Sequence, residues 1–196
     1  MSYTLSLTIG YLLGCFNTAH FISKTKGFDI RETGSGNAGA SNIKISLGWK
    51  FGILTALTDI LTAYIAVKLC QYLFPNDELV GFIGGAAAVL GHIFPFYLKF
   101  KGGKGYACYT GMLLAINYKL ALIMMAYGVI TTLVTNYIAL ATISTSYIVL
   151  IYYIYIKAPI GVIIILLILA IVITYKHLIN IKRIIRKEEI GLRKKK

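Results

Sequence analysis

Between two apolar runs the chain reads Gly91-His92-Ile93-Phe94-Pro95-Phe96-Tyr97-Leu98-Lys99-Phe100-Lys101-Gly102-Gly103-Lys104-Gly105. Glycines let a backbone approach an oxyanion closely, and a lysine among them adds a mobile positive charge. If the apolar segment that begins at Tyr106 is a helix, its N-terminus also favours a negative charge there. The stretch therefore predicts a phosphate held at the edge of a membrane. A plain turn whose lysines mark the cytoplasmic side would account for such a loop as well.

The composition indicates a membrane protein. Of the 196 residues, 58% are hydrophobic, and the mean hydropathy is +0.75, which is too apolar for a soluble domain of this size. Only 14% of residues are charged, yet the net charge is +13. Such a basic excess favours anionic lipid headgroups or phosphorylated substrates over nucleic acid. The three cysteines are far apart in apolar runs, and no Cys/His cluster has metal-ligand spacing, so we expect no disulfide and no metal site.

Apolar runs predict an all-α polytopic membrane protein with seven transmembrane helices, two of them short, in one domain over residues 1–196. The first run, 3–22, has no positive charges before it and no cleavage site after it, so it predicts a retained helix. The short segments near the polar loop suggest helices that line a cavity. The predicted spans are 3–22, 51–74, 79–98, 106–116, 120–135, 138–156 and 160–175.

Basic residues predict the orientation. Five lie between the first two spans, three lie in the Lys99–Lys104 stretch and nine follow the last span, whereas Lys68, Lys119 and Lys157 fall near the opposite side. By the positive-inside rule the N-terminus is outside and the C-terminus inside. This places all three polar stretches on one face, where we expect them to converge.

A second candidate anion loop reads Thr33-Gly34-Ser35-Gly36-Asn37-Ala38-Gly39-Ala40-Ser41-Asn42. Small, hydroxyl and amide groups dominate it, which cannot make a core but suits wrapping an anion with backbone N–H groups. Interior asparagines argue against a flexible linker. In the following span, Asp59 is costly unless it is paired or faces a polar cavity. A helix–helix hydrogen bond and a role at the site are both open for it.

A third polar group follows the last span. His177 and Asn180 are three residues apart, so on a continuing helix they share one face. Beside lysines and arginines they are suited to donate to one phosphate. The alternative is a basic amphipathic tail that rests on anionic lipid, and we prefer that reading for residues 187–196.

In their order and spacing, these three groups of residues resemble the bacterial acyl-phosphate:glycerol-3-phosphate acyltransferases of the inner membrane. The resemblance covers nearly the whole chain. It implies transfer of a fatty acyl group from acyl phosphate to the 1-hydroxyl of glycerol 3-phosphate, which gives lysophosphatidic acid and phosphate in the first step of phospholipid synthesis. It also implies an active site on the cytoplasmic side and no coenzyme A, metal or other cofactor. The implied partners are acyl phosphate, glycerol 3-phosphate and membrane lipids, without nucleic acid.

The resemblance also implies site residues. The implied catalytic residues are Lys104, which stabilises the leaving phosphate, His177 and Ser35. The implied substrate- and phosphate-binding residues are Gly34, Gly36, Asn37, Gly39, Asn42, His92, Lys101, Gly102, Gly103, Gly105 and Asn180.

Three positions depart from the family pattern. Ile45 replaces an arginine, Thr62 replaces a lysine and Ala139 replaces a serine. These changes remove two positive charges and a hydroxyl, and one charge-assisted hydrogen bond contributes about 1.5–3 kcal/mol. Two alternatives therefore stand beside the acyltransferase. One is a divergent relative that uses another phosphorylated acceptor, and the other is a non-catalytic membrane protein that binds phosphate or lipid.

Overall fold

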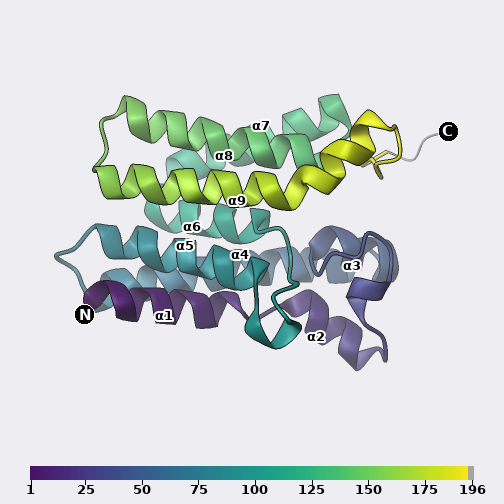
Figure 1. The fold of residues 1–196 in the computed structure, drawn as a ribbon, viewed down its shortest axis with the longest axis horizontal. Helices are drawn as coiled ribbons and strands as arrows, with labels where there is room; N and C mark the ends of the chain where they lie inside the picture. Colours follow the sequence, from purple (N-terminus) through teal and green to yellow (C-terminus); the bar gives the residue numbers. More distant parts are fainter. Residues whose placement is uncertain (194–196) are drawn as a thin grey trace. The chain divides into compact units, whose positions relative to one another are not determined.

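The computed structural model describes residues 1–193, in which every regular element is helical. The contacts divide the chain into two compact units, Met1–Ile116 and a second that begins at Asn117 (Figure 1). The first unit holds α1 (Ser2–Gly14), α2 (Thr18–Thr25), the 3₁₀ turn η1 (Ile30–Glu32), α3 (Ala40–Leu47), α4 (Trp49–Leu73), α5 (Leu79–Ile93), the 3₁₀ turn η2 (Phe96–Leu98) and α6 (Tyr106–Ile116). The second holds α7 (Tyr118–Thr135), α8 (Ile138–Tyr155) and α9 (Ile160–Ile185).

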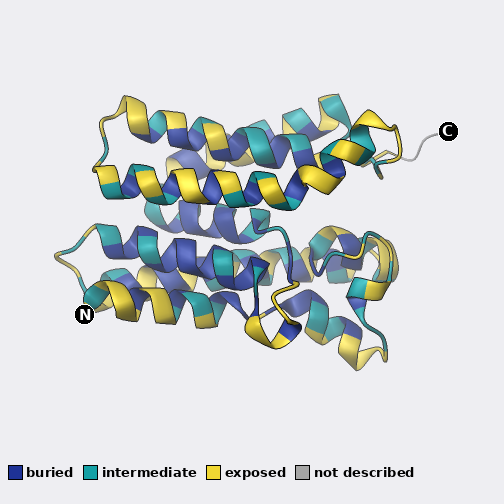
Figure 2. Ribbon diagram, viewed as in Figure 1, coloured by how far each residue is buried: buried dark blue, intermediate teal, exposed yellow. Residues whose placement is uncertain are grey.

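The most buried helix of the first unit is α5, which packs against α1, α4 and α6 and is drawn largely in the colour of buried residues in Figure 2. Its Gly84–Ala88 run brings these neighbours close, because small residues let helix backbones approach. A Cβ on Gly10 of α1 would overlap the carbonyl oxygen of Gly84. This close contact is the packing that a run of small residues allows.

The first apolar run does not form one continuous helix. It breaks at Cys15–Asn17, where Asn17 becomes the N-cap of α2 and its Oδ1 accepts a hydrogen bond of 2.9 Å from the His20 N–H. A side-chain oxygen at this position satisfies an N–H group that has no partner within the helix. The break directs α2 away from α1 and places it beside the polar segment that follows.

A small apolar cluster lies beneath the polar segment. Ala19, Ile30, Ala38 and Ile43 are fully buried together, which joins α2, η1 and α3. The expectation that residues 33–42 make no core is therefore wrong for Ala38. The flanking isoleucines provide apolar surface that the ten small residues lack, and Ala38 packs against it.

In the second unit α8 packs against both α7 and α9. The chain folds back after α9: the Leu192 N–H donates to the carbonyl oxygen of Asn136, and the Arg193 N–H donates to Asn136 Oδ1 at 2.8 Å. Leu192 and Arg193 are thus attached to the turn between α7 and α8. The remainder of the predicted tail, residues 194–196, lies outside the described residues.

Within residues 1–193, six helical segments are long and apolar enough to cross a membrane, and the apolar helix α6 is shorter. The seven predicted apolar segments are all present. The segment predicted at 120–135 begins earlier, at Tyr118, because the Asn117 side chain caps α7 by accepting a hydrogen bond of 3.0 Å from the Leu120 N–H. With 18 residues α7 qualifies as a span by itself.

Candidate active site

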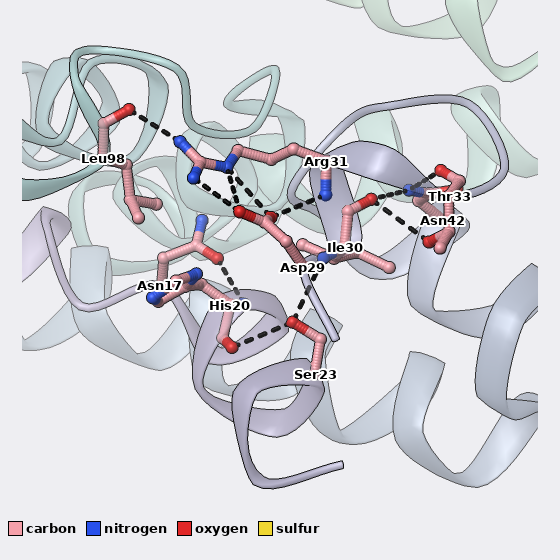
Figure 3. Close-up of polar contacts among 9 residues, drawn as sticks. All are labelled: Asn17, His20, Ser23, Asp29, Ile30, Arg31, Thr33, Asn42 and Leu98. Atoms are coloured by element: carbon pink, nitrogen blue, oxygen red, sulfur yellow. Dashed lines mark hydrogen bonds and ion pairs between the residues drawn. The ribbon is translucent and has the colours of Figure 1, made fainter. Parts of the chain in front are cut away.

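The 33–42 loop is organised from inside by Asn42, which is fully buried at the start of α3. Its Nδ2 donates to the carbonyl oxygens of Ile30 and Thr33, both at 2.9 Å (Figure 3). Its Oδ1 accepts a hydrogen bond of 2.8 Å from the Ser35 N–H. Three hydrogen bonds use both N–H groups and the oxygen of the amide. Asn42 therefore shapes the loop.

The residues at the tip of the 33–42 loop face outward. Gly34 and Gly36 are exposed, and both have positive φ, at +55° and +74°. That conformation suits glycine and allows two reversals of the chain within three residues. Ser35 and Asn37 are half-buried beside them. Short hydroxyl and amide side chains are thus presented on an accessible loop held rigidly from below, while Gly39 is buried at the N-cap of α3.

The 99–105 loop is organised by its own backbone. The Gly102 N–H donates to the carbonyl oxygen of Ile93 at 3.1 Å, and the Gly103 N–H donates to that of His92 at 3.0 Å. A Cβ on Gly103 would overlap the His92 imidazole at Nε2. The glycines therefore let the loop lie directly on the end of α5, and their N–H groups donate within the protein.

A lysine and the start of a helix lie at the end of this loop. Lys104 is half-buried, and α6 starts two residues later, at Tyr106. The first turn of a helix has N–H groups without intrahelical partners and a positive dipole end. Gly105, with φ +87°, turns the chain into this helix. Lys101 is exposed on the outer side of the loop.

Arg31 connects the two loops. Its guanidinium pairs with the Asp29 carboxylate, with a shortest distance of 2.6 Å from Nη2 to Oδ2, and its Nη1 donates to the carbonyl oxygen of Leu98 at 2.9 Å (Figure 3). These hydrogen bonds from Arg31 lower the pKa of Asp29 to about 2. The pair stays charged at neutral pH and fixes η1, which precedes the 33–42 loop, to η2, which precedes the 99–105 loop.

The break between α1 and α2 also contacts both loops. Asn17 Nδ2 donates to the carbonyl oxygen of Ala38 at 3.0 Å, in the 33–42 loop. The Asn17 N–H donates to the Tyr97 hydroxyl at 3.3 Å, and that hydroxyl donates to the carbonyl oxygen of Cys15 at 2.7 Å. Tyr97 belongs to η2. The two candidate anion loops of the first unit thus lie on one scaffold.

His177 and Asn180 lie on α9 in the second unit, and both are buried. His177 Nδ1 is 2.8 Å from the carbonyl oxygen of Ile173. Because a carbonyl oxygen only accepts, Nδ1 carries the hydrogen and Nε2 is the acceptor nitrogen of the ring. Asn180 Nδ2 donates to Glu189 Oε1 at 2.6 Å. The returning C-terminal segment therefore orients the Asn180 amide.

Comparison with known proteins assigns the chain. The sequence profile described as "Glycerol-3-phosphate acyltransferase" matches residues 4–187. Glycerol-3-phosphate acyltransferase 1 of Oceanobacillus iheyensis is 38% identical over 98% of this chain and 96% of that protein. The glycerol-3-phosphate acyltransferase of Aquifex aeolicus is 34% identical over 91% and 93%. The chain belongs to the glycerol-3-phosphate acyltransferase family.

Two crystal structures of PlsY, an integral membrane glycerol 3-phosphate acyltransferase, share its fold. The glycerol 3-phosphate form superposes with a TM-score of 0.91 at 32% identity, over 98% of this chain and 96% of that chain. The lysophosphatidic acid form gives 0.87 at 31% identity, over 97% and 95%. This chain is accordingly a multi-pass integral membrane protein of the acyltransferase family.

The departure from the family pattern at position 45 lies directly at the 33–42 loop. Ile45 is 49% exposed on α3, and its Cγ2 would be 3.6 Å from a Cβ placed on Gly34. The neighbouring Lys44 points elsewhere, because its Nζ lies 3.9 Å from the ring centroid of Trp49. Lys44 therefore does not take the place of the family arginine in this structure.

The other two departures lie in helices. The Thr62 hydroxyl donates to the carbonyl oxygen of Asp59 at 3.0 Å within α4, and Ala139 is buried at the start of α8.

Sequence reasoning missed the scaffold residues Asn17, Arg31 and Tyr97. An asparagine inside an apolar run was a visible signal for the helix break, whereas the pairing of Arg31 with Leu98 leaves no local mark in the sequence.

Proposed function

We propose that this chain transfers a fatty acyl group from acyl phosphate to the 1-hydroxyl of glycerol 3-phosphate. The observation that carries the proposal is the whole-chain match to PlsY, whose structures are a glycerol 3-phosphate form and a lysophosphatidic acid form. The two accessible, rigidly supported loops of the first unit support it, because both proposed substrates carry a phosphate. Acyl phosphate and membrane lipids are the further proposed partners.

The proposed reaction needs positioning and charge stabilisation more than activation. The hydroxyl oxygen attacks the acyl carbonyl carbon, the bond from that carbon to the phosphate oxygen breaks, and the released phosphate carries away the hydroxyl proton. Acyl phosphate already holds a good leaving group, so oriented binding and stabilisation of the developing negative charge supply most of the acceleration. Lys104 and the first turn of α6 provide positive charge for the leaving phosphate.

The remaining roles follow from exposure and hydrogen bonding. Ser35 and Asn37 present hydroxyl and amide donors on the accessible side of the 33–42 loop and would hold phosphate. His177 and Asn180 would bind the second substrate through the His177 Nε2 and the amide oriented by Glu189. Asn42, Gly102 and Gly103 would support the loops from within, because their donors are used inside the protein.

A second candidate function is the same transfer to another phosphorylated acceptor. Ile45 favours it, because this apolar side chain lies beside Gly34 where the family has an arginine. A guanidinium matches phosphate geometry in a bidentate manner, and isoleucine cannot replace it. An acceptor whose phosphate does not require a cation beside position 45 would suit this loop better than glycerol 3-phosphate.

An assay of the purified protein with palmitoyl phosphate and a panel of phosphorylated acceptors tests both functions. Equimolar formation of lysophosphatidic acid and phosphate with glycerol 3-phosphate is the expected result. Faster turnover with a different acceptor would support the second function. Absence of turnover with every acceptor would overturn both and leave a non-catalytic phosphate- or lipid-binding protein.

The proposed location is the bacterial inner membrane, with the N-terminus outside and the active site on the cytoplasmic side. The distribution of lysine and arginine supports this orientation. The variants Glu78→Cys and Ile190→Cys test it, because the native cysteines are buried and the unsubstituted protein serves as the control. A membrane-impermeant thiol reagent should label position 78 in intact cells. Labelling of position 190 would contradict the orientation.

A further inference from the structure

A buried acidic–basic pair lies in the core of the first unit. Asp59 of α4 is 1% exposed and His92 of α5 is 3% exposed, and Asp59 Oδ1 is 3.7 Å from His92 Nδ1. Ionisable groups inside membrane helices are costly and pair with one another. A buried pair of this kind adds little net stability in comparison with apolar residues of the same size. Its physical effect is therefore better sought in what it orients.

The other side of the same imidazole faces the 99–105 loop. A Cβ on Gly103 would overlap His92 Nε2, so this nitrogen lies directly against the Gly103 backbone. The carbonyl oxygen of His92 accepts the Gly103 N–H at 3.0 Å. His92 thus contacts Gly103 through both its ring and its backbone, one residue before Lys104.

The Asp59 carboxyl group faces Nδ1 at 3.7 Å, beyond hydrogen-bond distance. A polar group at this place favours the ring orientation that turns Nδ1 toward it. Rotation of the ring by half a turn would place a carbon atom against Asp59. The ring orientation in turn sets the surface on which Gly103 rests. A shift of this surface would be passed to Lys104 and to the start of α6, where Tyr106 begins the helix.

We propose that Asp59 and His92 are positioning residues that hold the Gly102–Gly105 backbone, and with it Lys104, in place to bind the phosphate of the acyl donor. The inference rests on the proposed function for the identity of that phosphate. Direct contact with substrate does not fit the pair, because both side chains are buried and the loop backbone covers the His92 ring.

Kinetics of Asp59→Asn separate positioning from a general structural role. This variant keeps the size of the side chain and replaces its carboxyl group with an amide. We expect the KM for palmitoyl phosphate to rise about tenfold, while the KM for glycerol 3-phosphate stays within about twofold. The matched control is Thr55→Val, because Thr55 is fully buried one turn earlier on α4 and its hydroxyl donates only within its own helix, to Phe51. Its two KM values should not change.

The coupling between the two residues gives a second test. If Asp59 acts through the imidazole, Asp59→Asn combined with His92→Leu should be no worse than His92→Leu alone, because the second change has nothing left to disturb. If the two substitutions raise the KM for palmitoyl phosphate independently, so that their factors multiply in the double variant, the proposed coupling is overturned. If Asp59→Asn does not fold, His92→Asn replaces it, since its shorter amide can reach Asp59 but not Gly103.

Amide hydrogen exchange tests the positioning without reference to activity. In Asp59→Asn we expect the Gly103 amide to exchange at least about tenfold faster, and the Ser35 amide, which Asn42 holds, to exchange at the wild-type rate. An unchanged Gly103 rate together with an unchanged KM for palmitoyl phosphate would overturn the inference. If the wild-type protein lacks turnover, the proposed function fails, while the exchange rate at Gly103 still tests whether the pair positions the loop.

Discussion

The 33–42 loop and the 99–105 loop are held in place by opposite means. In the first, one buried side chain, Asn42, makes three hydrogen bonds to backbone groups of the loop and of Ile30. In the second, the loop backbone can contact α5 because glycine has no side chain. Gly102 and Gly103 lie on the end of α5, and their N–H groups donate to its carbonyl oxygens. The first loop leaves its short polar side chains accessible, and the second leaves a lysine and a helix N-terminus.

This difference separates two tasks that a phosphate site requires. Neutral hydroxyl and amide donors, as on Ser35 and Asn37, fix the geometry of a bound phosphate, and a mobile cation such as Lys104 stabilises charge that develops during the reaction. It also predicts that the loops fail differently. The 33–42 loop should be most sensitive to loss of the Asn42 amide, which makes three of its hydrogen bonds. The 99–105 loop should be most sensitive to added volume at its glycines or to loss of Lys104.

The largest expected effect is on the lysine of the 99–105 loop. Lys104→Ala should lower kcat by at least about 10²–10³-fold, the usual loss when one group that stabilises transition-state charge is removed. The fold should persist, because Gly102 and Gly103 still hold the loop on α5. The matched control is Lys99→Ala, an exposed lysine of the same loop that has no assigned role in binding, and it should retain turnover to within a few-fold. If Lys104→Ala keeps near wild-type turnover, the lysine marks the cytoplasmic side of the membrane and has no role in the reaction.

The next largest effect concerns the support of the 33–42 loop. Asn42→Ala leaves two carbonyl oxygens and the Ser35 N–H without their partner, and buried unsatisfied groups cost about 1–3 kcal/mol each. We expect the free energy of unfolding to fall by about 2–4 kcal/mol, measured by denaturant titration in detergent. Ser41→Ala, at an exposed position on the same helix, is the control and should change it by less than about 0.5 kcal/mol. Equal decreases in the free energy of unfolding of the two variants would show that Asn42 does not support the loop.

Much of this organisation was visible in the sequence, and the invisible part has a physical reason. Apolar runs predicted the helices, and the glycine–lysine stretch predicted a loop before α6, because hydropathy and glycine content are local properties. The contact of Arg31 with Leu98 and that of Asp59 with His92 join residues far apart in the chain. The sequence showed the cost of a carboxyl group in a span but not its partner. The glycines were interpreted as anion ligands, whereas Gly102 and Gly103 donate to α5.

A smaller effect is expected from restoring the family arginine beside the 33–42 loop. If glycerol 3-phosphate is the acceptor, Ile45→Arg should raise its kcat/KM about tenfold, which corresponds to about 1.4 kcal/mol of regained phosphate binding. Position 45 has room for the longer side chain because it is 49% exposed. Lys44→Arg is the control, since that side chain lies over Trp49. Slower turnover of Ile45→Arg than of the native protein would indicate a repacked and already efficient site.

The smallest effect concerns the connection between the loops. The pKa of Asp29 is lowered to about 2 from an ordinary 3.8, so the stabilisation from its pairing with Arg31 is fully present above about pH 4. It is lost as the pH falls through about 2, because the folded state then also binds the proton. Asp29→Asn should therefore lower the free energy of unfolding by under about 1 kcal/mol at pH 7. The difference between the two proteins should disappear near pH 2. A difference that does not depend on pH would show that the charge on Asp29 is not its cause.

Amide hydrogen exchange in Asn42→Ala tests most directly whether each loop depends on its own local support, in addition to the scaffold that they share. The Ser35 amide donates to Asn42 Oδ1, and the Gly103 amide donates to the carbonyl oxygen of His92. We predict that the Ser35 amide exchanges at least about tenfold faster in the variant than in the wild type, while the Gly103 amide keeps its wild-type rate. Equal acceleration at both amides, or at neither, would contradict the account.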